Sequence, residues 1–213
     1  MEKKGILVVV SGFSGAGKGT LMKELLKNYD SYALSVSATT RSPREGEVHG
    51  KDYFFVTKEN FRGMIEAGEL YEFAEYTNNY YGTPRQYVDE RMAEGKDVIL
   101  EIEVQGAEKI KKQFPDTVLI FVTPPTAKEL KNRLIGRGSE TPETIRKRLN
   151  RAVEEAKYMP FYDYILVNDD LGTATKELHA IICSEHFKST RNREAILGIT
   201  DELREITKEK GEV

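Results

Sequence analysis

The stretch Gly12-Phe13-Ser14-Gly15-Ala16-Gly17-Lys18-Gly19-Thr20 decides the fold. It follows Ile6 to Val10, an apolar and mostly β-branched run that is typical of a strand buried on both faces, and it precedes a helical pattern of leucines that ends near Asn28. A strand, a glycine-rich loop with G-x-x-x-x-G-K spacing and a helix, in that order, predict a phosphate-binding loop. Glycines let backbone N–H groups converge on phosphate oxygens, and the helix N-terminus adds partial positive charge.

The end of this loop predicts how the phosphates and their metal are held. Lys18 is expected to reach the terminal phosphates of a nucleotide. The next position, where Ser or Thr would ligate Mg²⁺, is Gly19, and the hydroxyl comes one place later at Thr20. Because glycine has no side-chain ligand, we expect no direct metal ligand from the protein, and a Mg²⁺ held by nucleotide phosphates and water.

The rest of the chain alternates strand and helix patterns. Strands are predicted at 98–102, 118–122 and 164–167, and helices from about 104, from Thr126, from Thr141-Pro142 and over about 171–187. Thr126 with Glu129 fits a capping box, and Pro142 suits the first position of a helix. Strict alternation implies a parallel sheet covered by helices on both faces.

Two segments break this rhythm. Residues from about 37 to 81 are rich in Tyr, Arg, Glu and Gly and indicate a small, more antiparallel insertion. Residues 193–210 form a charged helical pattern that carries Ile196, Leu197, Leu203 and Ile206. We expect that helix to pack on the domain or on a second subunit.

Composition bounds the class of protein. The chain has 213 residues and a net charge of −3, from 35 acidic and 32 basic side chains. This length fits one domain with an insertion, and the mild acidity offers no electrostatic drive toward nucleic acid or a membrane surface. The run Ile6 to Val10 is far below the roughly 18 apolar residues of a spanning helix. We therefore expect a cytoplasmic protein with no nucleic-acid or membrane partner, and the sequence leaves a homo-oligomer open.

Beyond the loop, the sequence resembles guanylate kinases over nearly the whole chain to about residue 187. The motifs that carry the resemblance are SGFSGAGKGT (11–20), SVSATTRSPREGE (35–47), GKDYFF (50–55), NYYGT (79–83), LEIEVQG (100–106) and VNDD (167–170). Three positions depart from the family pattern: Phe13 replaces the common Pro, Gly19 follows the lysine, and Glu103 stands where Asp is usual. Glu103 leaves the geometry of a metal-water contact open.

The resemblance implies a P-loop NTPase fold, a three-layer α/β/α arrangement with a parallel sheet, plus a small mixed α+β GMP-binding insertion and a mobile lid. The core is then 1–36 and 84–187, with the lid at about 136–144. The insertion is 37–83 and the C-terminal helical extension is 188–213. The implied reaction transfers the γ-phosphoryl group of Mg-ATP to GMP or dGMP, giving ADP and GDP.

The resemblance also implies the site residues. The ATP-binding residues are Ser14, Gly15, Ala16, Gly17, Lys18, Gly19, Thr20, Arg133, Arg137 and Asn168. The GMP-binding residues are Ser37, Arg41, Arg44, Tyr53, Glu72, Tyr81, Thr83 and Glu101. The catalytic residues are Lys18, Arg41, Arg137 and Arg148. Asn168 either touches the adenine or is a turn residue at the end of a strand.

These assignments make chemical sense. Arginine matches phosphate bidentately, and a phenol adds a donor. Glu72 would accept from N1–H and the 2-amino group of guanine, whereas adenine would leave the carboxylate unpaired, which supports roughly 10⁴-fold discrimination. No general base is required, because the acceptor phosphate oxygen already carries charge. Glycines in the segment 136–138 would let the lid close and exclude water.

Two other functions compete with this one. A guanylate-kinase-like protein-binding module that has lost catalysis would have no reason to keep Lys18, Arg41, Arg44 and Arg148. A related small-molecule kinase, such as an adenylate or ribose-bisphosphate kinase, is disfavoured because Glu72, Tyr81 and Thr83 suit a guanine edge.

Overall fold

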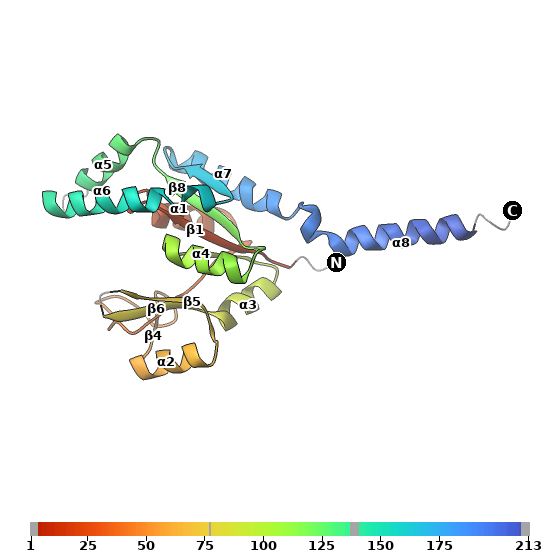
Figure 1. The fold of residues 1–213 in the computed structure, drawn as a ribbon, viewed down its shortest axis with the longest axis horizontal. Coiled ribbons are helices and arrows are strands. Elements are labelled where there is room, and N and C mark those ends of the chain that lie inside the picture. Colours follow the sequence, from red (N-terminus) through yellow and green to blue (C-terminus); the bar gives the residue numbers. More distant parts are fainter. Residues whose placement is uncertain (1–3, 77, 137–140, 210–213) are drawn as a thin grey trace.

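A five-stranded parallel sheet forms the centre of the molecule (Figure 1). The structure is a computed structural model that describes residues 4–76, 78–136 and 141–209. The strand order is β2 (Tyr32–Leu34), β7 (Asp97–Glu101), β1 (Leu7–Gly12), β8 (Val118–Thr123) and β9 (Tyr164–Val167). All neighbouring pairs are parallel. The central strand β1 is buried along its whole length, as its continuous apolar run predicts.

Helices cover both faces of this sheet, which confirms the predicted three-layer α/β/α arrangement. Side chains of a strand alternate between faces, so Val8 and Val10 pack on one side and Leu7 and Val9 on the other. The first side holds α1 (Lys18–Asn28) and α7 (Leu171–Glu185). The second side holds α3 (Arg85–Ala93) and α4 (Val104–Gln113).

The predicted insertion is a second, mixed sheet with its own small core. Its strand order is β4 (Phe54–Phe55), β3 (Ala38–Thr39), β6 (Asn79–Pro84) and β5 (Leu70–Tyr76). The β3–β4 pair is parallel and the other pairs are antiparallel. Phe61 of α2 (Lys58–Glu66) is fully buried against Ala38 and Leu70. Helix α4 lies between this insertion and the parallel sheet (Figure 1).

Helices α5 (Ala127–Gly136) and α6 (Pro142–Ala156) pack on each other at the loop end of the sheet. Both begin where the sequence predicts. The Thr126 hydroxyl accepts from Glu129 N at 3.0 Å, and the Thr141 hydroxyl accepts from Thr144 N at 3.3 Å. The predicted lid at 136–144 spans the connection between them, and its residues 137–140, which include Arg137, lie outside the described part of the chain.

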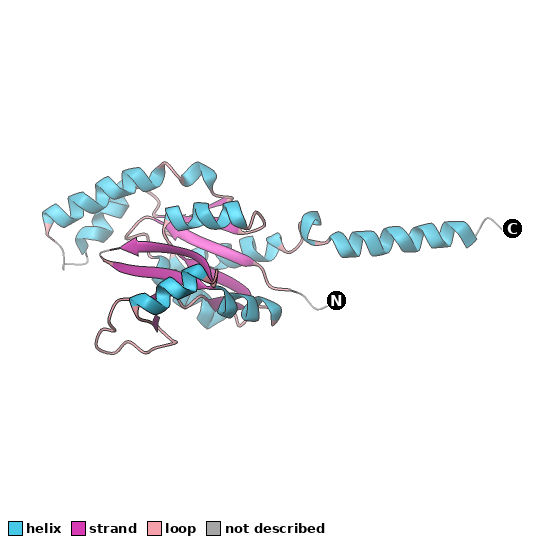
Figure 2. Cartoon of the chain, turned by 60° about the horizontal axis from the view of Figure 1, so that its bottom comes forward, coloured by secondary structure: helices cyan, strands magenta, loops and turns pink. Residues whose placement is uncertain are grey.

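The C-terminal helix extends away from the body. After the 3₁₀ turns Met159–Phe161 and Ser189–Arg191, helix α8 (Arg193–Glu209) stands clear of the sheets in both views (Figures 1 and 2). Its apolar side chains are exposed: Ile196, Leu197, Ile199, Leu203 and Ile206. The expectation that this helix packs on the domain is therefore wrong.

The reason lies in the turn before α8. The Asn192 side-chain amide donates to the carbonyl oxygens of His186 and Lys188, at 2.8 and 2.9 Å, which ties the start of α8 to the end of α7. Packing of α8 on a second subunit stays a prediction. None of the helices in the described ranges is long and apolar enough to cross a membrane.

Candidate functional site

The phosphate loop joins β1 to α1 and depends on glycine at particular positions. Gly15 and Gly17 have φ of 101° and 87°, in the left-handed region that other residues avoid. A Cβ on Gly17 would lie 2.7 Å from the side-chain nitrogen of Asn168. The loop therefore holds a compact conformation at the N-terminus of α1, where backbone N–H groups favour an anion.

Lys18 folds back over this loop. Its Nζ donates to the carbonyl oxygens of Gly12 at 2.8 Å and Phe13 at 3.3 Å. Burial lowers the pKa of Lys18, while the carboxylates of Glu101 and Glu103 act in the opposite direction. The ammonium group thus lies among acceptors that a nucleotide phosphate can replace.

A pocket of about 390 Å³ opens on the loop. Six of the predicted ATP-binding residues line it: Ser14, Gly15, Gly17, Lys18, Gly19 and Thr20. Ala16 does not, because it is fully buried and its N–H donates to Phe13 O at 3.0 Å. Lys23, five residues further along α1, also lines the pocket and was missed, because that spacing from Lys18 does not place the two lysines on one helix face and gave no signal.

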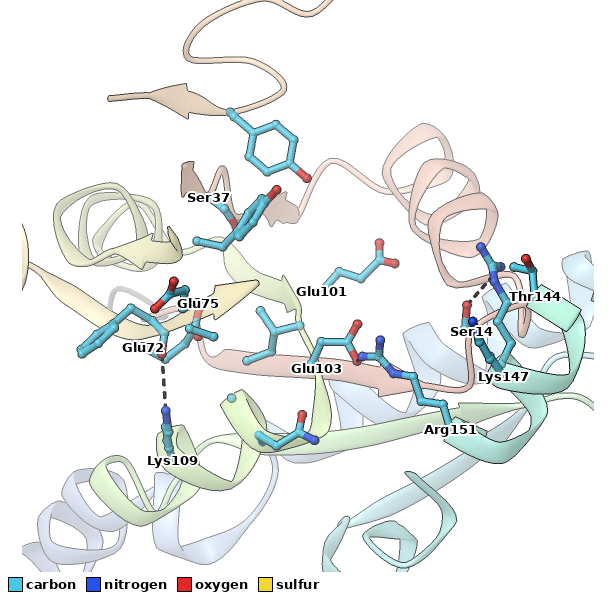
Figure 3. Close-up of a pocket in the computed structure, with 18 residues that line it drawn as sticks. Ser14, Ser37, Glu72, Glu75, Glu101, Glu103, Lys109, Thr144, Lys147 and Arg151 are labelled. Atoms are coloured by element: carbon cyan, nitrogen blue, oxygen red, sulfur yellow. Dashed lines mark hydrogen bonds and ion pairs between the residues drawn. The ribbon is translucent and has the colours of Figure 1, made fainter. Parts of the chain in front are cut away.

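A larger cleft of about 780 Å³ separates the insertion from the core (Figure 3). Seven predicted residues line it: Ser14, Ser37, Tyr53, Glu72, Tyr81, Glu101 and Arg148. Ser14 and Glu101 border both pockets, so the two spaces meet at the phosphate loop. A ligand in the cleft and a ligand on the loop would therefore have their near ends side by side.

Glu72 lies at the insertion end of this cleft. The Thr83 hydroxyl donates to Glu72 Oε1 at 3.0 Å, and burial raises the pKa of the Glu72 carboxyl. Thr83 is itself fully buried, so it orients Glu72 from behind instead of lining the cleft. Gly106 at the start of α4 leaves room for this carboxylate, since a Cβ there would lie 3.3 Å from Glu72 Oε2.

The two insertion arginines are placed differently from Glu72. The Arg41 guanidinium makes a two-point ion pair with Glu47, at 2.9 and 2.8 Å, and lies over the Tyr53 ring. Arg44 is exposed, and its backbone N–H donates to the same Glu47 carboxylate at 2.7 Å. Neither arginine lines the cleft, although Tyr53 and Tyr81 beside them do. Glu47 belongs to the motif 35–47, but its pairing with Arg41 was missed.

Arg148, Arg133 and Asn168 make contacts at or next to the loop. Arg148 of α6 donates to the Ser14 hydroxyl at 3.3 Å. Arg133 of α5 donates to Asn168 O at 2.8 Å and pairs with Glu129. Asn168 is buried, and its side-chain amide donates to Ala16 O at 2.8 Å. This contact favours the strand-end alternative for Asn168, and its contact with adenine stays a prediction.

Arg151 lines the large cleft and was missed in the sequence. It pairs with Glu103 at 2.8 Å and with Glu155 at 2.9 Å. The signal was the spacing of Arg148, Arg151 and Glu155, which places all three on one face of a helix.

Comparisons with known proteins agree with this geometry. The guanylate kinase family model matches residues 4–185. The guanylate kinase of Clostridioides difficile (strain 630) is 54% identical over 195 residues, covering 92% of this chain and 95% of the relative. That of Halalkalibacterium halodurans is 53% identical over 192 residues, covering 90% and 94%. The crystal structure of guanylate kinase from Anaplasma phagocytophilum superposes with a TM-score of 0.71 at 33% identity, covering 92% of this chain and 95% of that one.

Proposed function

The chain belongs to the guanylate kinase family, and from that premise we propose that its two joined pockets transfer the γ-phosphoryl group of ATP to GMP or dGMP, releasing ADP and GDP. One observation carries the proposal. The phosphate-loop pocket and the cleft that holds Glu72 share Ser14 and Glu101, so a donor on the loop and an acceptor in the cleft converge there. Convergence of this kind supplies the proximity that phosphoryl transfer needs.

ATP is assigned to the loop pocket. Loop N–H groups and the α1 N-terminus receive the phosphates, and Lys18 exchanges its bonds to Gly12 and Phe13 for bonds to phosphate oxygens. Arg148, already at Ser14, neutralises charge on the transferring group. Arg133, Arg137 and Asn168 are further proposed contacts of ATP.

GMP is assigned to the large cleft. Glu72, with Ser37 and Glu101, takes the guanine edge, and the buried Thr83, predicted as a direct contact, acts by holding Glu72. The phosphate lies toward Tyr53 and Tyr81, with Arg41 and Arg44 beside them. Arg41 already presents its fork to the Glu47 carboxylate, a geometry that also suits a phosphate.

Transfer then rests on positioning and charge. The attacking oxygen of GMP is ionised near neutral pH, so no side chain has to remove a proton. Closure of the lid at about 136–144 over the cleft would exclude water that could otherwise accept the phosphoryl group.

Guanylate kinases use ATP, and kinases of this kind generally use Mg²⁺ with it. We propose that a Mg²⁺ bound with ATP is held mainly by phosphate oxygens and water, and neutralises charge between them. The residues fit this arrangement. Gly19 offers no ligand, and the Glu101 carboxylate, which acts electrostatically on Lys18, could accept hydrogen bonds from water around the ion. No group of three or more acidic, His or Cys side chains is spaced for a metal in the ranges that the structure describes.

A coupled ADP-release assay with ATP plus GMP, dGMP, AMP, CMP or UMP tests the proposal. We expect turnover with GMP and dGMP and far slower turnover with AMP. Equal rates with AMP and GMP would refute the base selection, and no turnover with any acceptor would favour the binding module.

Lys18→Ala tests the phosphate loop. We expect the variant to stay folded and to lose turnover, because the cation at the terminal phosphates is gone. Lys27→Ala is the matched control, since Lys27 lies on the same helix with its side chain 74% exposed. Retained turnover in Lys18→Ala would remove the loop assignment.

A further inference from the structure

Arg151 bridges two carboxylates beside the phosphate loop. Its Nη2 lies 2.8 Å from Glu103 Oε2, and its Nε lies 2.9 Å from Glu155 Oε1. Figure 3 shows the Glu103 and Arg151 side chains pointing toward each other across the cleft, from the start of α4 and from α6. A guanidinium can make both contacts at once because its donors form a rigid fork.

Glu155 fixes the position of this fork. The residue is 4% exposed, and its Oε2 has no hydrogen-bond partner among the described residues. Burial and the nearby Glu103 raise the pKa of the Glu155 carboxyl. A carboxylate this deeply buried needs a cation beside it. Glu155 therefore anchors Arg151 from within the fold, while the half-exposed end of Arg151 faces the cleft.

The same groups act on Lys18. The Glu101, Glu103 and Glu155 carboxylates favour the charged form of Lys18, and Arg151 opposes it, so all four lie within electrostatic reach of the loop lysine. Without Arg151, the Glu103 carboxylate would stand uncompensated beside Lys18, where a polyphosphate has to bind. Like charge at that place would repel the nucleotide.

We propose that Arg151 is a positioning residue for ATP, which neutralises Glu103 at the phosphate loop while Glu155 holds it in place. The inference rests on the proposed function. It adds to that function a pair of opposite charges, Arg151 and Glu103, beside the pocket assigned to ATP. It also gives a role to Glu103, one of the three positions that depart from the family pattern, because its side chain reaches across to α6.

Steady-state kinetics on Arg151→Gln, Glu103→Gln and the double variant test the inference. We expect Arg151→Gln to raise KM for ATP about tenfold, with KM for GMP and kcat changed less than about threefold, because Glu103 is left uncompensated. The double variant should bring KM for ATP back to within about threefold of the parent, since both charges are then absent. Arg146→Gln, an exposed arginine of α6 outside the cleft lining, is the matched control and should behave as the parent.

Arg151→Gln also leaves Glu155 buried without its cation, which threatens folding. Arg151→Gln with Glu155→Gln removes that burden and should show the same rise in KM for ATP, reversed when Glu103→Gln is added. An unchanged KM for ATP, equal increases for both substrates, no reversal by Glu103→Gln, or the same loss in Arg146→Gln would overturn the role of Arg151. A parent chain that fails to phosphorylate GMP at all would instead overturn the proposed function beneath it.

Discussion

The proposed selection of guanine over adenine depends on one side chain, Glu72. Its carboxylate is held by the Thr83 hydroxyl, and its burial beside α4 keeps water from competing for it. A guanine edge offers two donors to such a group, whereas adenine offers a lone pair at the same place. The cost of leaving a buried acceptor unpaired makes the choice steep.

Replacing Glu72 by Gln should lower the ratio of kcat/KM for GMP over that for AMP by roughly ten- to a hundredfold, because one charged acceptor is lost. Competition assays with both nucleotides measure the ratio directly. Glu75→Gln, in the same strand and cleft lining, is the comparison variant. An unchanged ratio would count against Glu72 as the selector.

The raised pKa of Glu72 also gives a pH dependence. Because burial favours the neutral carboxyl, Glu72 takes up a proton at a higher pH than an exposed glutamate does, and the protonated form accepts guanine donors less well. KM for GMP should therefore rise as the pH falls through this raised pKa. The phosphate of GMP titrates as well, but equally in Glu72→Gln, so the difference between the two pH profiles isolates the carboxyl. Parallel profiles would contradict the assignment.

Strand β1, helix α1 and the loop between them together form the proposed phosphate-binding element. The chain turns sharply enough only because glycines occupy the left-handed positions, and Asn168 at the end of β9 closes the loop through Ala16. Helix α6 contributes two arginines to the same site. Arg148 and Arg151 lie about one turn apart on one face of the helix, and they contact Ser14 of the loop and Glu103.

Gly17→Ala should lower the free energy of unfolding by about 1–3 kcal/mol, because the new Cβ would clash with the Asn168 amide and the backbone would stay in the left-handed region. Gly19→Ala is the control: it lies inside α1, and a Cβ there would meet nothing within 4 Å beyond its chain neighbours and the backbone of its own helix. Alanine there should be neutral or stabilising by up to about 1 kcal/mol. Urea unfolding of both variants measures the contrast, and equal stabilities would contradict it.

Over the whole molecule, the cleft between insertion and core is open, with about 780 Å³ of space. Helix α2 on the insertion and helix α6 on the core lie on opposite sides of it (Figure 1). Water in a site this open could accept the phosphoryl group, so we expect the two sides to approach each other during the reaction.

We expect the distance between α2 and α6 to shorten markedly when a non-hydrolysable ATP analogue and GMP bind together, and to change less with either alone. Dye labels on Arg62→Cys and Asn150→Cys report it by fluorescence energy transfer, in a chain where Cys183, the one native cysteine, is replaced by Ser. Equal distances in the apo and doubly liganded states would contradict the prediction that α2 and α6 approach each other.

Removing α8 should leave the rest intact. A chain ending at Asn192 should keep kcat, and at low protein concentration its free energy of unfolding should stay within about 0.5 kcal/mol of the full chain, because the apolar side chains of α8 are exposed. A large loss at low concentration would contradict this. Sedimentation of both chains tests the second-subunit alternative, which requires self-association of the full chain alone.

Local pattern was enough to predict much of this protein. The phosphate loop, the caps of α5 and α6, strand β9 at 164–167 and the mixed insertion follow from short-range spacing of glycines, hydroxyls and apolar residues, because backbone geometry is decided within a few residues. Seven of the eight residues that line the loop pocket were predicted, but only seven of the eighteen that line the large cleft.

Other features were settled only when distant segments came together. The order of the central strands joins Leu7 to Val98, and the bridge from Glu103 to Arg151 spans α4, β8, α5 and about two thirds of α6 in sequence. The direction of α8 depends on one turn at Asn192. Charge pairs and helix directions of this kind depend on which surfaces the fold brings within a few ångströms, and one-dimensional spacing carries no record of that distance.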